Sequence, residues 1–334
     1  MAKKFKAAVV GCGRIGFEFD LDPKRTYVST HAKSYDTLKE TTLAAVCDAD
    51  SERLKRCLDK YPHVRGYVSA EEMLRREKPD LLSICTPPAT HKEVFELAVG
   101  HGVKGVFCEK PIADKSAAGL KMAELAKRKK VVLQIGHQRR FDRLHQDIWK
   151  KIQTNAWGSL QQGNFYYTAG IYNTGSHMFD LLRFLFGDVK WVQAHVNPNR
   201  PETPDPNLDG MLEFKSGKRF SFQALDVKHY LCFEMNCFFE KARLMLRHSG
   251  FSVQLETPQA SPYFTGYQDL LPAKSDLIAD YPRNFMIEGV KELILAVKEK
   301  RPSISSGQDG VASLACIEAA VVSAKNNGRK IILS

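Results

Sequence analysis

A glycine-rich turn directly after the first apolar run constrains the fold more than any other feature of this chain. Phe5 to Val10 is an apolar segment that we predict to be a buried strand, and it leads into Gly11-Cys12-Gly13-Arg14-Ile15-Gly16. In a strand–turn–helix unit, the first glycine permits the tight turn, the second lets a pyrophosphate approach, and the third allows close packing. Phosphates then bind the free N–H groups at the helix N-terminus. The predicted dinucleotide contacts here are Gly11, Gly13, Arg14, Ile15 and Gly16.

The same alternation of strand and helix continues to about residue 136. Short apolar runs are separated by stretches with the 3.6-residue periodicity of helices. The predicted strands are Leu43–Cys47, Leu81–Cys85, Gly105–Cys108 and Val131–Ile135, and the predicted helices are Ala32–Glu40, Ser51–Tyr61, Ala70–Lys78, Lys92–His101 and Lys115–Lys130. Such alternation is typical of an α/β fold with a parallel sheet and helices on both faces. We therefore predict a doubly wound Rossmann domain over residues 1–136.

Residues 137–334 have a different rhythm and are predicted to form a second, α+β domain. Long strand-like runs dominate its middle, and Ser216-Gly217 and Ser249-Gly250 are typical of hairpin turns. The predicted strands are Gly163–Thr168, Val189–Asn197, Gly210–Phe214, Arg219–Asp226, Tyr230–Phe239, Ala242–Arg247, Ser252–Glu256 and Lys330–Leu333, and the predicted helices span about 141–154, 174–186, 283–300 and 307–326. This pattern predicts an antiparallel or mixed sheet covered by helices.

Composition places the chain among soluble globular proteins. Hydrophobic residues make up 43% of its 334 residues, and no apolar run approaches the roughly 20 residues that a membrane-spanning helix needs. The basic N-terminus leads into a strand rather than into the apolar segment of a secretory signal. Eight cysteines occur without a CxxC pair, which favours small buried hydrophobes in a reducing cytosol over a zinc site. We expect a cytoplasmic protein without a bound metal or a membrane partner.

The formal net charge of +11 admits two interpretations. Lys and Arg are spread along the chain and no recognition motif accompanies them, which argues against a nucleic-acid partner. The alternative is attraction of anionic ligands, such as a dinucleotide or a phosphorylated or nucleotide-linked substrate. The run Lys127-Arg128-Lys129-Lys130 is expected at a helix C-terminus, where cations suit the helix dipole.

Asp48, at the end of the second predicted strand, is the candidate for the adenosine ribose. Its carboxylate can accept hydrogen bonds from both ribose hydroxyls and would repel a 2′-phosphate, so NAD is favoured and NADP is less expected. An N-cap role at the following helix is an alternative that is compatible with the first.

The spacing between the glycine turn and Asp48 is unusual. Gly16 and Asp48 are 32 residues apart, whereas about 20 is usual. The excess of about 12 residues falls in Phe17–Thr30, which is rich in aromatic and charged residues. We expect an insertion that emerges beside the cofactor phosphates, either as a lid or substrate-facing loop or as a surface or oligomer-contact loop.

Four further segments extend the pattern over most of the chain. They are Ile84–His91 (ICTPPATH), Glu109-Lys110-Pro111, Gly136–Phe141 (GHQRRF) and Gly175–Asp180 (GSHMFD). With these segments, in this order, the chain resembles the Gfo/Idh/MocA oxidoreductase family, which includes glucose–fructose oxidoreductase and inositol dehydrogenase. The Glu-Lys-Pro tripeptide together with the downstream Gly-x-His-x-x-Asp is the specific part of this resemblance.

The resemblance implies a Rossmann domain followed by a domain with a large open, mostly antiparallel sheet, and an active site between them. It implies dimers or tetramers through that sheet. It also implies cofactor contacts from Cys85, Thr86, Pro87, His91, Glu109, Lys110 and Gln138, the last near the nicotinamide, and substrate contacts from Gln138, Arg139, Asn173 and Asp180.

Lys110 and His177 are the candidate catalytic residues. The Lys110 ammonium, expected at the carboxyl end of a parallel strand, can hydrogen-bond a substrate oxygen and stabilise negative charge on it. A histidine titrates near neutral pH, as a general acid/base must, and the family motif favours this role for His177 over a buried structural one. Asp180 lies on the same helical face and is expected to orient the imidazole, to accept a substrate hydroxyl or to make a structural hydrogen bond.

Asn173 departs from the sugar-dehydrogenase pattern, in which relatives often carry Asp four residues before the histidine. An amide can bind a hydroxyl or cap the helix, but it carries no charge. The leading hypothesis is an NAD(H)-dependent oxidoreductase that acts on a secondary alcohol or ketone of a sugar, cyclitol or nucleotide-sugar, and the positive charge favours an anionic member of this class. The alternative is a catalytically silent NAD-binding regulator or scaffold of the same fold.

Overall fold

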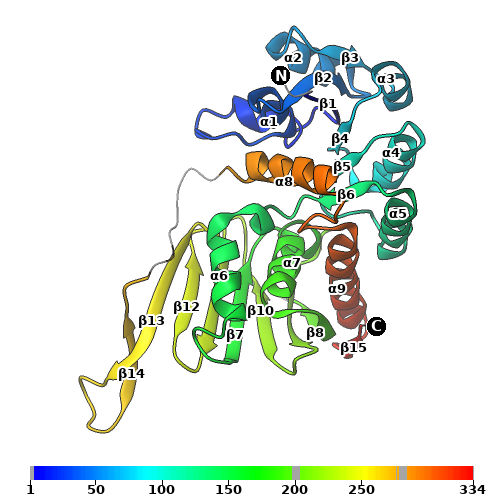
Figure 1. The fold of residues 1–334 in the computed structure, drawn as a ribbon. Helices are drawn as coiled ribbons and strands as arrows, with labels where there is room; N and C mark the ends of the chain where they lie inside the picture. Colours follow the sequence, from blue (N-terminus) through cyan, green and yellow to red (C-terminus); the bar gives the residue numbers. More distant parts are fainter. Residues whose placement is uncertain (1–3, 198–203, 276, 278–283, 334) are drawn as a thin grey trace. The chain divides into compact units, whose positions relative to one another are not determined.

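The computed structural model describes residues 4–197, 204–275, 277 and 284–333, which form two compact units (Figure 1). The first unit comprises Met1–Asp142 and Pro282–Val311, and the second comprises Arg143–Tyr281 and Ala312–Ser334. The division differs from the predicted domains 1–136 and 137–334, because the late segment 282–311 packs with the first unit. The chain therefore crosses between the units three times.

The first unit contains the predicted parallel sheet, which has six strands instead of the five predicted. The strand order is β3-β2-β1-β4-β5-β6. The strands are β1 (Phe5–Val10), β2 (Thr41–Cys47), β3 (Arg65–Tyr67), β4 (Leu81–Ile84), β5 (Gly105–Cys108) and β6 (Val132–Ile135). Helices α1 (His31–Thr37), α2 (Ser51–Lys60), α3 (Ala70–Glu77), α4 (Pro88–Gly100) and α5 (Ser116–Lys129) alternate with them. Fully buried strands such as β4 and β5 explain the continuous apolar runs of the sequence.

Helix α8 (Phe285–Glu299) completes the core of this unit although it is distant in sequence. Its glycine, Gly289, lies so close to β5 that an added Cβ would be 2.9 Å from the Phe107 ring. The Gly289 carbonyl accepts a hydrogen bond of 2.8 Å from the Gln134 side chain of β6. Apolar residues of α8, including Val290 and Leu293, are fully buried. These contacts explain why the segment 282–311 belongs to the Rossmann unit.

The second unit contains a nine-stranded sheet with the order β14-β13-β12-β11-β7-β10-β9-β8-β15. Strands β7 and β10 pair in parallel and every other neighbouring pair is antiparallel, which confirms the predicted mostly antiparallel sheet. The strands are β7 (Leu160–Tyr167), β8 (Val189–Val196), β9 (Leu208–Phe214), β10 (Arg219–Ala224), β11 (Phe233–Phe239), β12 (Arg243–Arg247), β13 (Ser252–Ala260), β14 (Gln268–Pro272) and β15 (Ile331–Ile332).

Helices cover one face of this sheet (Figure 1). They are α6 (Arg143–Gln153), α7 (Gly175–Phe186) and α9 (Gly307–Lys325), the last of which begins in the first unit. Phe179 of α7 packs on Phe222 of β10 with ring centroids 5.5 Å apart, and Phe186 contacts Phe220 at 5.6 Å. The aromatic layer between α7 and the sheet fixes the helix that carries the Gly-x-His-x-x-Asp motif.

Local signals explain most boundaries. Thr30, Asp50 and Ser69 are the N-caps of α1, α2 and α3, each with its side chain accepting backbone N–H groups. Helix α5 ends in Lys127, Arg128 and Lys129, with Lys130 as a left-handed C-cap, as the charge run predicted. Gly217 and Gly250 have positive φ in the predicted hairpin turns. All eight cysteines are free thiols, six of them buried.

Candidate active site

The glycine turn has the geometry that its spacing predicted. Gly11 has a φ of +98°, and an added Cβ there would lie 2.7 Å from the Cys85 carbonyl carbon of the β4–α4 connection. A Cβ on Gly16 would lie only 1.9 Å from the Gly11 carbonyl oxygen. Around Gly13, by contrast, no atom of the described residues lies within 4 Å of such a Cβ. Gly11 and Gly16 therefore close the turn on itself, whereas Gly13 leaves space into which a phosphate group fits.

The insertion separates the glycine turn from α1 in sequence, but helix-type hydrogen bonds connect the two across it. The N–H of His31 donates to the Ile15 carbonyl at 3.2 Å, and the N–H of Ala32 donates to the Gly16 carbonyl at 3.1 Å. Each pair is 16 residues apart in sequence, where a continuous helix has a separation of four. Twelve residues are thus looped out of the helix. Without them, the 32 residues from Gly16 to Asp48 become the usual 20 or so.

The inserted segment is itself folded onto the first unit. It contains a short 3-10 helix, Glu18–Leu21, and its Phe19 ring lies under two guanidinium groups, Arg14 at 4.8 Å and Arg25 at 3.8 Å. The Asp20 carboxylate accepts a hydrogen bond of 2.9 Å from the Ser29 N–H and another from the Thr30 hydroxyl. The insertion therefore holds a side chain of the glycine turn, Arg14, by a cation–π contact.

Asp48 lies at the carboxyl end of β2, next to the glycine turn. Its Oδ2 accepts a hydrogen bond of 2.7 Å from the Cys12 N–H, and its Oδ1 accepts one of 2.9 Å from the Asp50 N–H. A carboxylate has about four acceptor positions, so both oxygens retain capacity for ribose hydroxyls. The suggested N-cap role of Asp48 is wrong, because Asp50 caps α2 by accepting the N–H groups of Glu52 and Arg53.

The connection after β4 places Cys85, Thr86 and Pro87 beside the glycine turn, with Thr86 half-buried and Pro87 exposed. His91 is different, because its side chain is fully buried in α4. Its Nε2 lies 2.7 Å from the Thr86 carbonyl and its Nδ1 lies 3.1 Å from the Pro111 carbonyl. Burial lowers the pKa of His91. Both ring nitrogens are used within the protein, so His91 joins two loops instead of offering a nitrogen to a ligand.

Glu109 and Lys110 follow β5 directly. The Glu109 carboxylate is buried, and its Oε2 accepts a hydrogen bond of 3.2 Å from the Lys110 N–H. Its Oε1 lies 3.0 Å from Nε2 of His31, which is completely buried in α1. Burial opposes ionisation of Glu109, but the His31 hydrogen bond and nearby positive charge outweigh it and hold the pKa below its ordinary value. The site therefore contains a buried, ionised carboxylate next to the candidate catalytic lysine.

Gln138 and Arg139 follow β6 in the 3-10 helix Gln138–Phe141 and are half-buried. The Gln138 amide lies 4.0 Å from the Met286 sulfur of α8. An added Cβ at Gly136 would lie 2.7 Å from Oε1 of Glu109, so this glycine allows the β6 connection to approach the carboxylate. In this way, the structure places predicted residues at the carboxyl ends of five neighbouring strands, β2, β1, β4, β5 and β6.

The second unit carries the other predicted residues on and before α7. His177 is half-buried, Asp180 is 1% exposed, and both lie on this helix three residues apart. Asn173 is exposed and lies in a π-helical turn, Gly170–Thr174, that precedes α7. The N-cap alternative for Asn173 is wrong, because Thr174 occupies the N-cap position and makes no side-chain cap hydrogen bond.

Asp205, which the sequence analysis did not single out, holds this π-helical turn. Its Oδ1 accepts a hydrogen bond of 2.7 Å from the Tyr172 N–H, and its Oδ2 accepts one of 2.9 Å from the Asn173 N–H. A Cβ on Gly170 would lie 2.2 Å from the Asp205 carboxyl carbon. A carboxylate at the N-terminal end of a helix also interacts favourably with the positive end of the helix dipole. The turn that precedes the His177 helix is thus held by a side chain 32 to 33 residues away in sequence.

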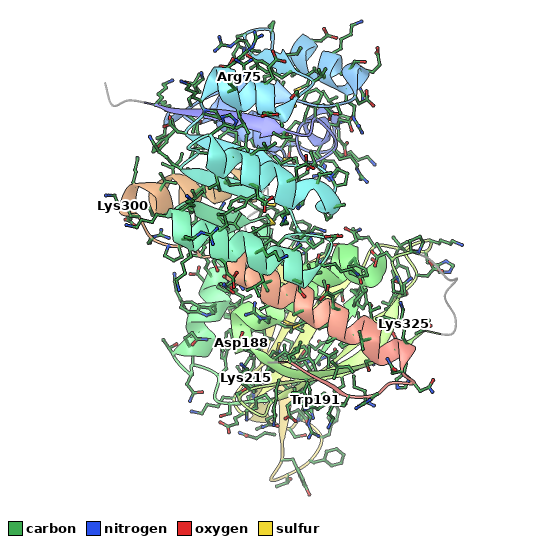
Figure 2. All side chains as sticks on the ribbon, turned by 90° about the vertical axis from the view of Figure 1, so that its right-hand side faces the viewer. Arg75, Asp188, Trp191, Lys215, Lys300 and Lys325 are labelled. Atoms are coloured by element: carbon green, nitrogen blue, oxygen red, sulfur yellow. The ribbon has the colours of Figure 1, made fainter. Side chains whose placement is uncertain are left out.

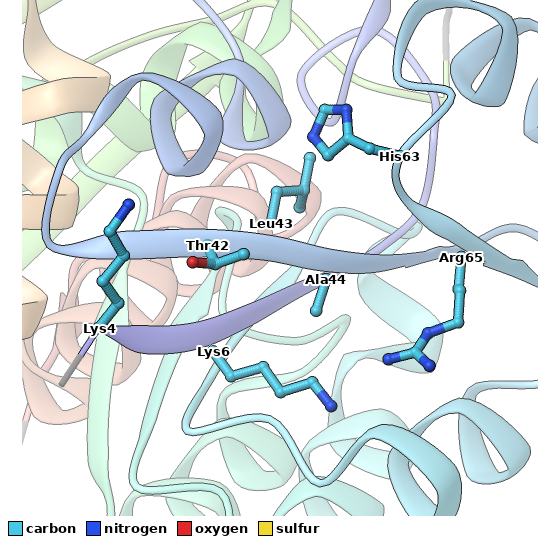
Figure 3. A pocket seen from close by; sticks show the side chains of 7 residues that line it. All are labelled: Lys4, Lys6, Thr42, Leu43, Ala44, His63 and Arg65. Carbon is cyan, nitrogen blue, oxygen red and sulfur yellow. The ribbon is translucent and has the colours of Figure 1, made fainter.

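A surface hollow of about 560 Å³ lies at the opposite, amino-terminal edge of the parallel sheet (Figure 3). Four basic side chains line it, from Lys4, Lys6, His63 and Arg65. Lys6 and Arg65 form ion pairs with Glu77, and His63 contacts Asp36. These pairings neutralise much of the local charge, so the hollow is a weaker candidate for an anion than the glycine turn.

The distribution of the remaining charge matches the spread seen in the sequence. The labelled cations Arg75 and Lys300 lie on α3 and after α8 of the first unit, and Lys215 and Lys325 lie after β9 and at the end of α9 in the second (Figure 2). Within the residues that the structure describes, no group of three or more His, Cys, Asp or Glu side chains is arranged to hold a metal ion. Over the same residues, no helix combines the length and apolarity needed to cross a membrane.

The parallel sheet, the glycine turn and Asp48 define the first unit as a dinucleotide-binding Rossmann domain. Residues 5–137 match the model of the oxidoreductase family with an NAD-binding Rossmann fold, and residues 168–333 match the model of the family's C-terminal alpha/beta domain. The chain therefore belongs to the Gfo/Idh/MocA oxidoreductase family, as the motifs predicted.

Known relatives are similar over part of their length. D-apiose dehydrogenase from Paraburkholderia graminis is 28% identical over 58% of this chain and 52% of the relative. Myo-inositol 2-dehydrogenase from Thermotoga maritima is 28% identical over 46% of this chain and 42% of the relative. The matched stretches thus span about half of these relatives. The fold of the WlbA dehydrogenase from Bordetella pertussis, solved with NADH and UDP-GlcNAcA, is similar with a TM-score of 0.79, at 20% identity over 99% of both chains.

Proposed function

We propose that this protein is an NAD(H)-dependent dehydrogenase or reductase that transfers a hydride between the nicotinamide and a secondary alcohol or ketone. The observation that carries the proposal is the pair Glu109-Lys110 at the carboxyl end of β5, in the same sheet as the glycine turn. In open parallel sheets, ligands bind at this edge. A buried carboxylate beside a lysine there serves chemistry rather than stability alone, since its desolvation is costly.

The residues present fit a dinucleotide. Gly13 opens into free space within the described part of the chain, and the N–H groups that follow it can bind a pyrophosphate. The part of the cofactor between the pyrophosphate and the nicotinamide would be held by Thr86, Pro87, Lys110 and Gln138. His91 would support Thr86 through its contact with the Thr86 carbonyl. The bound nicotinamide supplies the hydride chemistry, and the protein supplies orientation and charge.

Asp48 favours NAD over NADP. Its carboxylate is fixed by the Cys12 and Asp50 N–H groups at 2.7 and 2.9 Å, so it cannot swing away from the ribose position without losing both hydrogen bonds. A 2′-phosphate there would meet a negative charge. Arg53, 3.5 Å from Oδ1, is the nearest cation and is already engaged by Asp48 and Asp50.

Lys110 and His177 are the proposed reacting groups of the protein. The Lys110 ammonium would donate a hydrogen bond to the substrate oxygen and stabilise the negative charge that develops on it. His177 would take or return the hydroxyl proton. Asn173 and Asp180, together with Arg139, are proposed to bind the substrate's other hydroxyl groups, and Asp205 would hold the turn that presents Asn173.

The proposed substrate class is a sugar, cyclitol or nucleotide-sugar. The relatives' names cover all three, with apiose, inositol and a UDP-linked sugar acid. The net charge of +11 favours an anionic member of the class. Half-buried Arg139 follows Gln138 in the sequence, and a guanidinium can pair with a carboxylate or phosphate.

Native mass spectrometry of the purified protein tests cofactor and assembly together. We expect a mass increase that corresponds to bound NAD(H). Turnover is then measured by NADH absorbance with D-apiose, myo-inositol and UDP-GlcNAcA, and with NADP in place of NAD. Lys110→Ala and His177→Ala should each abolish turnover, and His177→Ala should retain NADH binding. NADH binding without turnover of any polyol would instead favour a silent NAD-binding regulator.

We also propose a cytoplasmic homodimer or homotetramer that assembles through the C-terminal sheet. Eight free thiols suit a reducing compartment. The β13–β14 hairpin at the edge of the sheet carries three exposed aromatic side chains, Tyr263, Phe264 and Tyr267, which are 81%, 67% and 71% exposed. Such a cluster at a sheet edge favours a protein contact. Sedimentation velocity of the wild type and of a variant with all three changed to Ser tests this assembly, and a monomeric wild type would exclude it.

A further inference from the structure

His31 lies at the centre of a buried hydrogen-bonded chain that ends at Glu109. Its Nε2 is 3.0 Å from Oε1 of Glu109, and its Nδ1 is 2.8 Å from the Ser83 hydroxyl of β4. The Tyr35 hydroxyl, one helical turn after His31 on α1, is 2.9 Å from the same Ser83 oxygen. His31, Ser83 and Tyr35 are all 0% exposed. Three elements that are separate in sequence therefore meet in one polar chain inside an apolar core.

The order of protons in this chain follows from the acceptor at its end. An ionised carboxylate can only accept, so Nε2 of His31 must carry a proton toward Glu109. The Ser83 hydroxyl, 2.8 Å from Nδ1, donates its proton to the Tyr35 hydroxyl. The imidazole is also fixed in plane, because it packs edge-on against the Phe107 ring with centroids 4.6 Å apart. His31 thus presents one N–H to Glu109 in a single orientation.

Glu109 is held from three sides. His31 contacts Oε1, the Lys110 N–H donates to Oε2 at 3.2 Å, and the backbone of Gly136 lies close enough that a Cβ would be 2.7 Å from Oε1. The carboxylate therefore connects α1 to the backbone of Lys110. A shift of Glu109 would move the residue that carries the proposed catalytic ammonium.

We propose that His31 is a positioning residue for hydride transfer, whose imidazole fixes the Glu109 carboxylate and, through it, the Glu109-Lys110 turn. The inference rests on the proposed function for its catalytic consequence. It also gives a role to the residue that follows the insertion, because His31 is where the chain resumes helical hydrogen bonding with the glycine turn. Register at that point decides whether the imidazole faces Glu109.

Two substitutions separate the two hydrogen bonds of the ring. The side-chain nitrogen of glutamine is three bonds from Cβ, like Nε2, so His31→Gln keeps a donor toward Glu109. The nitrogen of asparagine is two bonds from Cβ, like Nδ1, so His31→Asn keeps only the Ser83 contact. His31→Leu removes both, and Tyr35→Phe is the matched control, because it removes a buried hydroxyl of the same chain without touching Glu109.

The first measurement is hydrogen exchange of the Lys110 amide by mass spectrometry, which needs no cofactor. We expect exchange about tenfold faster or more in His31→Leu and His31→Asn, since hydrogen bonds to charged groups are worth about that factor. His31→Gln and Tyr35→Phe should exchange like the wild type. Equal exchange in folded His31→Leu and wild type would overturn the positioning role.

The second measurement separates kcat from the KM for NAD, with whichever of the three proposed substrates the wild type oxidises fastest. We expect kcat to fall about tenfold or more in His31→Leu, with the KM for NAD changed less than about threefold, and His31→Gln to restore most of the rate. A change in the KM for NAD without a change in kcat would show that the role of His31 is only structural. An equal fall in kcat in Tyr35→Phe would show the same. A wild type without turnover contradicts the proposed function, while the exchange experiment still decides the positioning of Glu109.

Discussion

The N–H of His31 donates to the carbonyl of Ile15 at 3.2 Å, although the two residues are 16 positions apart in sequence. In a continuous helix, the donor and the acceptor are four positions apart. The glycine turn and α1 are therefore joined by helix-type hydrogen bonds although the insertion separates them in sequence. Because the chain leaves and rejoins at the same helical register, the looped-out residues are separable from the fold. The relationship also accounts for the position of His31, whose Nε2 lies 3.0 Å from Oε1 of Glu109.

Deletion of the twelve residues Glu18–Ser29 should leave a cooperatively folded protein. The deletion keeps Phe17, whose buried ring packs on Tyr61 at 6.1 Å, and joins it to Thr30 so that Ile15 and His31 become a normal helical pair. The lost ion pair of Glu18 with Arg56 is exposed and is worth about 1 kcal/mol or less. We expect an unchanged helix content by circular dichroism and NADH affinity within about threefold, since a loop of this length costs little to close. Loss of a cooperative thermal transition would show that the insertion is part of the core.

Gly13→Ala and Gly16→Ala should separate binding from folding. A methyl group at Gly13 meets open space among the described residues, so we expect a melting temperature close to that of the wild type and NADH affinity weakened about tenfold or more where the pyrophosphate approaches. At Gly16 the Cβ would lie 1.9 Å from the Gly11 carbonyl oxygen, so the protein itself should be destabilised, by about 1–3 kcal/mol. Thermal unfolding with and without NADH distinguishes the two variants. Equal destabilisation of both would disprove the assignment of Gly13 to cofactor binding and of Gly16 to the packing of the turn.

Asp48→Ala should reduce the proposed preference for NAD. The variant loses the acceptor for the ribose and the charge-assisted hydrogen bond from the Cys12 N–H, so affinity for NADH should fall about 10- to 100-fold. Arg53, released from Asp48, can then pair with a 2′-phosphate, so affinity for NADPH should fall less or rise. Asp50→Ala is the control, since it removes the α2 cap at a cost of about 1 kcal/mol and should change the ratio of the two affinities less, because Asp48 and its contact with Arg53 remain. Titration of NADH and NADPH fluorescence measures both.

Much of the fold could be predicted because periodicity and turn chemistry are local. The strands and helices of the Rossmann unit follow from apolar runs and caps, and the glycine turn and Asp48 follow from spacing. Strands β3 and β14 were missed because they lie at sheet edges and carry exposed polar residues instead of an apolar pattern. The domain boundary was displaced because α8 joins the first unit through contacts with residues 150 or more positions away.

The candidate site residues come from sequence motifs, whereas the residues that support them lie far away in the sequence and no motif marks them. His31 contacts Ser83 and Glu109, which are 52 and 78 residues away, and Asp205 contacts Tyr172 across 33 residues. No local pattern records such contacts. His31 in particular could not be recognised from the sequence. The insertion separates it from the glycine turn along the chain, although the two are hydrogen-bonded neighbours in the structure.

Glu77→Gln should destabilise the protein at neutral pH and progressively less in acid. Burial raises the pKa of Glu77, but hydrogen bonds from Tyr67 and Lys6 and the charge of Arg65 outweigh it and hold the pKa below its ordinary value of 4.5. An acid with a lowered folded pKa contributes stability above its unfolded pKa, and this contribution disappears as the pH falls through the folded pKa. We expect a loss of about 1–2 kcal/mol at pH 7, because Lys6 and Arg65 are partly exposed.

Urea unfolding between about pH 7 and pH 3 measures the free energy of unfolding for this comparison. The difference between wild type and Glu77→Gln should shrink below about pH 4.5, where the unfolded glutamate protonates. Glu72→Gln is the control, since its exposed ion pair with Arg76 should contribute less than about 0.5 kcal/mol at any pH. A difference that is constant with pH would assign the effect to packing and not to ionisation.

Asp205→Ala should loosen the turn before the His177 helix. The substitution removes two charge-assisted hydrogen bonds, of 2.7 Å from the Tyr172 N–H and 2.9 Å from the Asn173 N–H, together with a favourable charge at the positive end of α7. Loss of such a cap costs about 1–2 kcal/mol, so the free energy of unfolding should fall by that amount. Asn207→Ala removes a longer, neutral hydrogen bond of 3.3 Å to the Gly170 N–H and should cost less.

If Asn173 binds substrate as proposed, Asp205→Ala raises the KM for that substrate and leaves NADH affinity unchanged. An unchanged KM in a destabilised variant would restrict Asp205 to a structural role.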